Sequence, residues 1–531
     1  MIFKWDAVDV RDAKETMLMG SLGKVHFGKQ VLIAALVAVS LASAAPLLAE
    51  VRLPHSFSDH GVLQRGAPVH IWGWSDPKEQ VTVQFHAQTR TTTANEYGEW
   101  SLWLAPESAG GPYTMTVKGT SDAPITVSDL LVGDVWLASG QSNMEFPLKG
   151  FPGQAVLKNG AEEIANATLP QVRLLRIEHK AADFPANDVS ATWTTCTPET
   201  AADFSAVAYF FGREIQQKEH VPIGLIDSTW GGTPVDTWTS LDSLSSDAAL
   251  MPAFATWARF ADQQARRPAM IAEEQREDAA AVAAHQPKPK HPWHPEPESW
   301  QPAALYNGMI APLTPYSIKG VIWYQGETNS APERAPLYEK LFSTMIAGWR
   351  SAWQQGEFPF LFVQISSFNS PQENWGLLRD QQRRTLAVAN TAMAVTLDVG
   401  EADNVHPPDK QTVGARLAVA ALATVYGKPV EYSGPLFRQA VPEGSAMRVS
   451  FDHAAGLRTH GDTLLGFELA GKDHTFYPAK AEIAGSEKGS VVVTSDRVAD
   501  PVYVRYAWQG VTDANLYNAA DLPASTFTSE P

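Results

Sequence analysis

Ser142 stands just beyond the point where an apolar strand is expected to end. The run "DVWLASG" (134–140) is typical of a short buried strand, and its glycine marks the end of that strand. Open α/β sheets carry their chemistry beyond the carboxyl ends of their strands. Ser142 is therefore a candidate nucleophile, although a serine at this place can also serve as the N-cap of a helix.

A histidine that could activate this serine lies far downstream, in "LDVGEADNVHPPDK" (397–410). A serine nucleophile needs a base, and the base needs a carboxylate to orient it. Asp403 stands three residues before His406, on a loop that follows the predicted strand "AMAVTL". The pair therefore belongs to the end of a second strand. Asp398 and Glu401 on the same loop are alternative orienting acids.

Two further strand ends offer donors for the oxyanion of an acyl-transfer reaction. Gly231 and Gly232 follow the strand of "LIDSTWGG", where bare backbone N–H groups can approach a ligand closely. Gln325 and Asn329 follow the strand of "GVIWYQGETN" and carry amide donors. A plain turn would also explain the glycines, and helix capping would also explain the two amides.

Alternation of strands and helices from residue 130 onward predicts the sheet that would position these groups. Apolar strands such as "VPIGLIDS" and "FPFLFVQIS" alternate with helical patterns such as "LYEKLFSTMIAGWRSAW". This alternation favours a mostly parallel sheet with helices on both faces. Short alternating strands indicate β domains on either side. The predicted division is an N-terminal β domain (51–127), an α/β domain (128–430) and a C-terminal β domain (431–531).

A charged helical stretch and a proline-rich linker interrupt the α/β pattern at about 239–301. His285, His291 and His294 fall here, but the prolines between them prevent a shared helix face, so we predict no metal site. Cys196 is the one cysteine of the chain. It cannot form an intramolecular disulfide, and we expect it to be inert.

Composition narrows the classes of partner. A net charge of −17 argues against nucleic acid and against an anionic membrane surface. The 17 tryptophans suit a carbohydrate ligand, because indole faces stack on sugar rings, although most of them are expected in cores.

Residues 1–49 have the pattern of a secretory signal peptide. Lysines at 24 and 29 precede an apolar run, 31–44, that is too short for a spanning helix. Small residues then offer cleavage after Ala44 or after Ala49. We expect a mature protein without a membrane span, located in the periplasm or secreted.

Several longer motifs resemble those of the sialate O-acetylesterase family, within the SGNH hydrolase superfamily. The resemblance spans about residues 51–529, and its segments are "GQSNM", "WGGTPVDTW", "LYNGMIAPLTPYSIKGVIWYQGETN", "VHPPDKQTVGARLA" and "NLYNAADLPASTFTS". It implies a flavodoxin-like three-layer α/β/α domain with a Ser–His–Asp triad, flanked by β domains, and no metal or organic cofactor.

The resemblance also implies roles. Ser142 would be the nucleophile and a backbone oxyanion donor, and His406 would be the base. A glycine of the 231–232 pair would give a second donor, and the side chain of residue 325 or 329 a third. One position departs from the family: relatives often carry the acid in an "Asp-Ile-His" run, where this chain has Asn404. Asp403, at the three-residue spacing of the wider superfamily, is then the favoured acid.

The predicted activity is a carbohydrate O-acetylesterase acting on acetylated sialic acid or on acetylated hemicellulose fragments such as xylan or xyloglucan. Glu327 is a candidate substrate contact, and a sialic acid carboxylate would need a local cation in a protein of this charge. The arginines that could supply it are Arg379, Arg383 and Arg384. The alternative is that the protein binds carbohydrate without catalysis. The presence of a serine, a histidine and an aspartate that could form a triad favours an enzyme over this alternative.

Overall fold

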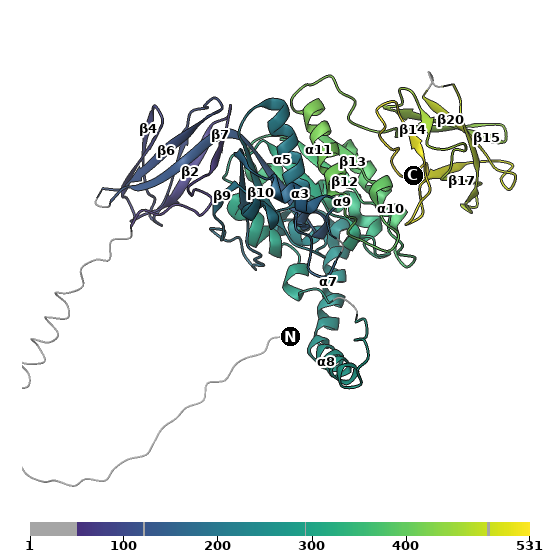
Figure 1. Ribbon diagram of the computed structural model, residues 1–531, viewed down its shortest axis with the longest axis horizontal. Coiled ribbons are helices and arrows are strands. Elements are labelled where there is room, and N and C mark those ends of the chain that lie inside the picture. The colour runs from purple at the N-terminus through teal and green to yellow at the C-terminus, as the bar shows by residue number, and fades with distance from the viewer. Residues whose placement is uncertain (1–49, 121–122, 155, 292–293, 486–488) are drawn as a thin grey trace, which may run out of the picture. The chain divides into compact units, whose positions relative to one another are not determined.

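A central sheet of mostly parallel strands carries the candidate site (Figure 1). Its order is β13 (Thr391–Val395), β12 (Phe360–Gln364), β11 (Gly320–Tyr324), β7 (Ile125–Gly140), β10 (Ile223–Thr229), β8 (Leu169–Arg176) and β9 (Trp193–Cys196). All pairs along this path are parallel except β8 with β9. β10, β11 and β12 are buried along their whole length, as expected of a sheet covered on both faces.

Helices cover both faces of this sheet. Gly320 of β11 pairs with Trp136 of β7, so these residues face one side, whereas Trp323, three residues further on, faces the other. The Trp136 ring contacts Phe211 of α5 (Ala206–Glu219), and the Trp323 ring contacts Phe342 of α9 (Tyr338–Trp353). α5 and α9 therefore lie on opposite faces. The predicted α/β class is confirmed.

Two further helices complete the layers. α11 (Lys410–Thr424) packs against α5, and α10 (Trp375–Arg384) packs against α9. A Cβ atom at Gly414 of α11 would lie 2.6 Å from the Cβ of Phe210, so a glycine there permits the close contact of α11 with α5. α9 shows why these segments are helical, because its buried side chains recur every three or four residues.

Antiparallel strands precede the central sheet. β3 (Gln80–Phe85) pairs with β4 (Gln88–Thr93) and β6 (Gly110–Lys118), and β6 pairs with the first part of β7. β1 (Val62–Gln64) also joins β7, and β2 (Val69–Trp74) pairs separately with β5 (Glu99–Leu104). β7 thus belongs to both sheets, and the predicted domain boundary at residues 127 and 128 falls inside this one strand.

Small antiparallel sheets follow the last helix. One contains β14 (Leu436–Glu443), β15 (Ala446–Asp452), β20 (Ser490–Thr494) and β19 (Lys480–Ile483). Another contains β18 (Tyr477–Pro478), β17 (Phe467–Ala470), β21 (Tyr503–Tyr506) and β23 (Phe527–Thr528), and β16 (Arg458–Thr459) pairs with β22 (Leu516–Tyr517).

The interruption expected at 239–301 is mainly helical as far as Ala283, and the described linker residues between Ala283 and Pro297 form no helix. It contains α6 (Leu241–Ser245), η2 (Ala248–Leu250), α7 (Met251–Gln264), α8 (Arg267–Ala283) and η3 (Pro297–Trp300). The Trp300 ring stacks on Phe260 of α7 at 4.3 Å, and its indole N–H donates to the Gly232 carbonyl at 2.7 Å. The insertion is therefore attached to one of the candidate site loops.

Short helical turns lie at the strand ends and connections. They are α2 (Ser142–Glu145), α3 (Gly160–Ala165), α4 (Pro198–Ala202), η1 (Val235–Trp238), η4 (Tyr306–Ile310), η5 (Ala311–Leu313), η6 (Glu327–Asn329), η7 (Ala335–Leu337), η8 (Thr385–Ala387) and η9 (Leu397–Val399).

The computed structural model describes residues 50–120, 123–154, 156–291, 294–485 and 489–531. The predicted signal peptide lies outside these residues. The chain from Val51 to Pro531 forms one compact unit, and its division into three domains stays a prediction. No helix in the described ranges is long and apolar enough to span a membrane.

Candidate active site

The backbone turns sharply between β7 and Ser142. Gly140 has a φ of 135°, and a Cβ atom there would lie 2.2 Å from the Tyr324 carbonyl oxygen, so only glycine fits. Ser142 then begins the one-turn helix α2, whose N-cap residue is Gln141. The N-cap alternative for Ser142 is therefore wrong.

Ser142 and His406 meet across the carboxyl ends of the strands. The Ser142 hydroxyl lies 2.7 Å from Nε2 of His406, and Nδ1 of His406 lies 2.6 Å from Oε1 of Gln154. The amide is placed with its oxygen toward Nδ1, and an amide oxygen only accepts, so this contact assigns the proton to Nδ1. Nε2 is then left as the acceptor for the serine hydroxyl, which is the tautomer that a general base needs.

The predicted orienting acids do not contact this histidine in the described structure. Asp403 is exposed. Asp398 forms a bidentate ion pair with Arg416, and Glu401 accepts a hydrogen bond from Asn404. The expected contact of Asp403 with His406 is therefore wrong for this structure, because the loop turns that carboxylate toward solvent.

An amide takes the place of the expected carboxylate. Gln154 is exposed on a turn in which its own N–H donates to the Phe151 carbonyl, and the Phe151 ring packs edge-on against His406. An amide fixes the tautomer of the imidazole but adds no negative charge to stabilise the imidazolium. Burial, with the nearby charge of Lys410, lowers the pKa of His406 to about 4, so the base is neutral at neutral pH.

The Asn143 side chain joins the loops around the serine. Its Nδ2 donates to Glu327 at 2.5 Å and to the Val405 carbonyl at 2.9 Å, and its Oδ1 accepts from Lys410. Glu327 belongs to the third strand-end loop, and Val405 precedes the histidine. A single amide thus ties the serine loop to the two loops that carry the other candidates.

The two ionisable partners of Asn143 are both buried. Burial raises the pKa of Glu327 and lowers the pKa of Lys410 to about 7. The Lys410 ammonium also lies 4.9 Å from the Phe146 ring centroid and 5.8 Å from that of Tyr324, positions in which aromatic faces stabilise a cation. Glu327, predicted as a substrate contact, thus has a protein partner on one of its two carboxylate oxygens.

The backbone N–H of Gly231 has a protein acceptor, whereas that of Gly232 has none among the described residues. The N–H of Gly231 donates to Glu145 at 2.6 Å, so its predicted oxyanion role would require Glu145 to release it. A Cβ atom at Gly231 would lie 3.2 Å from the Cβ of Ser142, which shows how closely this loop packs on the serine. Glu145 also pairs with His179, whose ring stacks on Trp230.

The side-chain amides of Gln325 and Asn329 also differ in whether a donor remains without a partner. Nε2 of Gln325 donates both to the Thr233 carbonyl and to Oδ1 of Asn329. The backbone N–H of Val235 also donates to Oδ1 of Asn329, which fixes the orientation of that amide. Nδ2 of Asn329 is buried and has no partner among the described residues, so Asn329 retains a donor and Gln325 does not.

The three arginines bind the protein itself. Arg379 is fully buried, and its guanidinium donates to backbone carbonyls that include those of Ser366, Gln509 and Gly510. The prediction that Arg379 binds substrate is wrong, because this guanidinium joins α10 to the C-terminal segment. The charged groups of Arg383 and Arg384 both pair with Asp380.

Two of the three histidines of the insertion pair with carboxylates, and the single cysteine is buried. His291 contacts Asp278 and His294 contacts Glu274, both on α8, whereas His285 is exposed. Within the described ranges, no group of three or more His, Cys, Asp or Glu side chains could hold a metal ion. Burial raises the pKa of Cys196 to about 12, so this thiol is protonated.

Sequence reasoning missed four residues of this site. Asn143, Glu145 and Lys410 stand inside or directly after motifs that had been singled out, so their proximity to the site could have been inferred. Gln154 gave no such signal. It lies in a loop of glycine and proline, 252 residues from the histidine that it contacts.

Known proteins are similar to most of this chain. A family model described as "Carbohydrate esterase, sialic acid-specific acetylesterase" matches residues 291–423. The sialate O-acetylesterase of Rattus norvegicus is 32% identical over 507 residues, covering 86% of this chain and 90% of the relative. That of Homo sapiens is 31% identical over 405 residues, 69% of each chain. The crystal structure of a carbohydrate acetylesterase from Xanthomonas citri is 36% identical, with a TM-score of 0.77, covering 90% of this chain and 99% of that one.

The fold, the loops at its strand ends and these relatives together define an esterase. More particularly, the chain belongs to the carbohydrate esterase family of sialic acid-specific acetylesterases. The resemblance seen in the motifs is thereby confirmed.

The first prediction concerns Gln154. Gln154→Ala should lower kcat by about tenfold or more, because the imidazole loses the acceptor that fixes its tautomer. Gln154→Glu should move the acid limb of the kcat/KM profile from about pH 4 to higher pH, since a carboxylate beside Nδ1 raises the pKa of His406. The pH profiles of a small acetate ester would measure both effects.

Asp403→Asn is the matched control for Gln154, because it changes the favoured acid on the histidine's own loop. It should stay within about twofold of wild type, as expected for an exposed group without a partner here. If Asp403→Asn lost most of its kcat while the Gln154 variants kept theirs, Asp403 and not Gln154 would be the residue that orients His406.

The second prediction concerns Asn143. Asn143→Ala should lower the melting temperature by about 5–10 °C, because Glu327, Lys410 and the Val405 carbonyl lose a buried partner. Asn166→Ala, at an exposed asparagine, should shift it by no more than about 2 °C. Equal melting temperatures for the two variants would contradict the joining role of Asn143.

Proposed function

We propose that this protein hydrolyses O-acetyl esters of carbohydrates with Ser142 as the nucleophile. The observation that carries the proposal is the 2.7 Å contact between the Ser142 hydroxyl and Nε2 of His406, in a chain of this esterase family. The Gln154 contact supports it, since the tautomer that it fixes leaves Nε2 free to accept the serine proton.

The proposed reaction follows acyl transfer through serine. His406 takes the hydroxyl proton as Ser142 attacks the acetyl carbonyl, and the oxyanion that forms accepts hydrogen bonds. His406 then returns the proton to the departing sugar oxygen, which leaves an acetyl group on the serine. A water molecule, deprotonated by the same imidazole, attacks this ester, and acetate and the free serine result.

The proposed oxyanion donors are the backbone N–H groups of Ser142 and Gly232 and the side-chain amide of Asn329. Ser142 begins a helix, where the first N–H groups have no partner within the helix. The unpartnered Nδ2 of Asn329 supports its choice over Gln325. The reaction as proposed uses no metal or organic cofactor.

We also propose that the central domain is a flavodoxin-like SGNH hydrolase domain with three layers. The support is the order of five parallel strands, β10-β7-β11-β12-β13. Numbered along the chain, this order is 2-1-3-4-5, which is that of flavodoxin-like sheets. β8 and β9 extend the sheet beyond β10.

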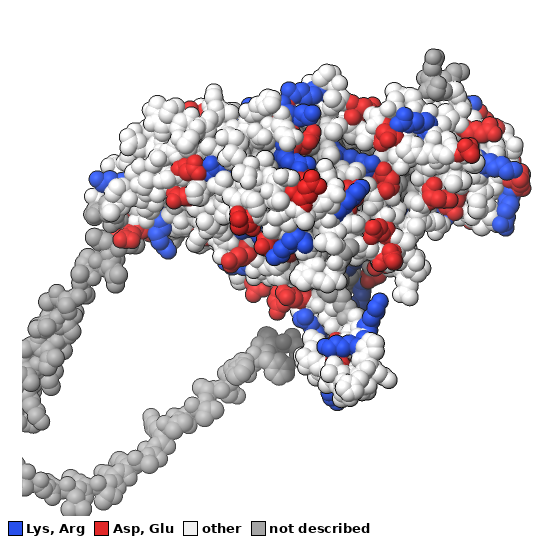
Figure 2. All heavy atoms as spheres, viewed as in Figure 1, with Lys and Arg blue, Asp and Glu red and all other residues white. Residues whose placement is uncertain are grey.

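Among acetylated sugars, we propose neutral hemicellulose oligosaccharides over sialic acids. The mammalian relatives are named for sialate, and the Xanthomonas citri protein is described only as a carbohydrate acetylesterase. The arginines considered for a sialic acid carboxylate bind the protein itself. Figure 2 shows acidic and basic side chains interspersed on the viewed face, and the net charge of −17 gives no attraction for an anion.

The third prediction tests this function. Ser142→Ala should fold normally and lose roughly 10³-fold or more in kcat, as removal of a triad serine does. Wild-type protein should release acetate from acetylated xylan or xyloglucan oligosaccharides faster than from 9-O-acetylated sialosides. Retained activity in Ser142→Ala would move the nucleophile elsewhere, and the opposite substrate preference would favour sialate.

We propose further that the protein is exported after cleavage near residue 44 or 49. The support is the order of lysines, apolar run and small residues in the first 49 residues. The fourth prediction is that mass spectrometry of the exported protein finds Ala45 or Glu50 as the first residue. An exported chain that retains Met1 would exclude cleavage.

A further inference from the structure

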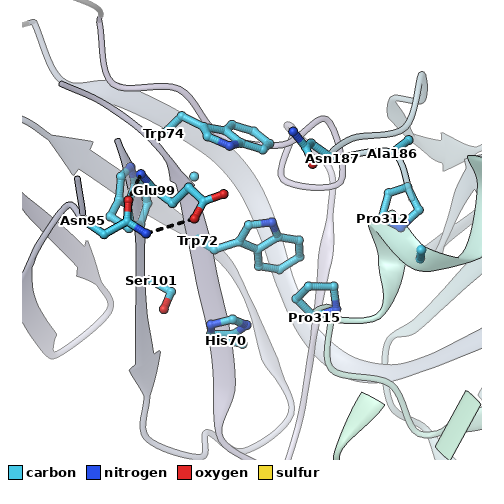
Figure 3. Close-up of a pocket in the computed structure, with 13 residues that line it drawn as sticks. His70, Trp72, Trp74, Asn95, Glu99, Ser101, Ala186, Asn187, Pro312 and Pro315 are labelled. Carbon is cyan, nitrogen blue, oxygen red and sulfur yellow. Dashed lines mark hydrogen bonds between the residues drawn. The ribbon is translucent and has the colours of Figure 1, made fainter. Parts of the chain in front are cut away.

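A cleft lies between the β2–β5 pair and residues 186–187 and 311–315 (Figure 3). Its volume is about 390 Å³, and none of the residues that line it belongs to the candidate active site. The rings of Trp72 and Trp74 project from β2 toward Asn187, Pro312 and Pro315 on the opposite wall. Trp72 is only 9% exposed and packs edge-on against Phe57, so Trp74 is the more open of the two indoles.

The strand register arranges this face in three rows. Trp74 pairs with Glu99, Trp72 with Ser101 and His70 with Trp103. On β5 these partners are the exposed residues of a strictly alternating strand. Each row therefore holds one aromatic ring of β2 beside one side chain of β5, and the third row is a stack of two rings with centroids 4.4 Å apart.

Exposed aromatic side chains stand close in sequence to residues that line the cleft. In the described ranges, the large hydrophobic side chains that are both exposed and aromatic are Tyr97 (87%), Phe184 (81%) and Trp103 (55%). Each stands two residues from a residue that lines the cleft. Of these three, Trp103 stands on the same face of β5 as the lining residues Glu99 and Ser101, so an exposed indole borders the cleft.

Polar groups stand among these rings. Glu99 points into the cleft, and one of its carboxylate oxygens accepts from Nδ2 of Asn95 at 2.9 Å. Oδ1 of Asn95 accepts hydrogen bonds from the backbone N–H groups of Tyr97 and Glu99. These bonds hold the turn that carries the two residues in place. The carboxylate and the Ser101 hydroxyl supply acceptors and a donor beside the indoles.

We propose that this cleft is a second, non-catalytic binding site for a neutral oligosaccharide. Pyranose rings offer C–H faces that pack on indole rings and hydroxyl groups that donate to carboxylates, and the cleft presents both partners side by side. The carboxylate of Glu99 and the net charge of −17 disfavour an anionic sugar. The proposal does not require that the active site act on the same glycan.

One loop connects the cleft with the active site. His179 contacts Glu145 beside the catalytic serine, and Asn187, eight residues further on, lines the cleft. Eight residues span at most about 29 Å, so the two sites lie within the length of one glycan chain of several sugars. A chain held in the cleft would therefore keep its acetylated units near Ser142.

The experiment is affinity electrophoresis of the full-length protein in gels that contain deacetylated xyloglucan or deacetylated xylan. These probes lack the ester on which the active site acts. At least one should retard the wild-type protein, and Trp103→Ala and Trp74→Ala should each weaken binding about fivefold or more. Leu465→Ala, which removes an exposed apolar side chain from the C-terminal segment, should bind as wild type does.

Hydrolysis of a small acetate ester separates this site from the proposed activity. Trp103→Ala and Trp74→Ala should hydrolyse it at the wild-type rate, and wild-type protein inactivated by a fluorophosphonate should still be retarded in the gel. The proposal is overturned if neither polysaccharide retards the wild type, if the two variants bind normally, or if inactivation at Ser142 abolishes retardation. Whether Ser142→Ala loses or keeps esterase activity tests the proposed function alone. Retardation in the gel tests the binding site independently of that result.

Discussion

The site depends on one side-chain amide, that of Asn143, which holds three loops in register. An amide has two donors on one end and an acceptor on the other, and here the donors meet a carboxylate and a carbonyl while the acceptor meets an ammonium. Aspartate would offer no donors in this place, and leucine would leave every partner unsatisfied. An acidic and a basic side chain can therefore be buried on either side of the serine loop without contacting each other directly.

Much of the site could be predicted from strand ends alone. Ser142, His406 and the two amides after β11 all follow apolar runs, and parallel strands bring their carboxyl ends to one edge. The orienting group could not be predicted in the same way. Spacing places Asp403 within reach of His406 but does not say which way the loop turns its side chain, and the observed partner comes from a distant turn. The prediction that Arg379 binds substrate was wrong for a related reason. Whether its side chain is buried depends on which segment packs over α10, and the sequence does not show that.

The fold was predictable where the alternation was regular and less so at the domain boundary. Composition changes near residue 128, from alternating polar and apolar residues to a continuous apolar run. That change marks where β7 leaves an antiparallel sheet with one covered face and enters a parallel sheet covered on both faces. The chain itself continues through the change as one strand, so composition located a difference in burial and not a break in structure.

The strand shared by the two sheets also sets the order in which the chain can fold while it is synthesised from its N-terminus onward. When the first part of β7 has been synthesised, its partner β6 is already present, because β6 lies only a few residues earlier in the chain. The second part is apolar and lacks both neighbours until residues 223–229 and then 320–324 have followed. During that interval an unpaired, hydrophobic edge stands open to other chains, which is where aggregation begins. The segment that leads to Ser142 is thus open to aggregation until both of its partner strands have been synthesised.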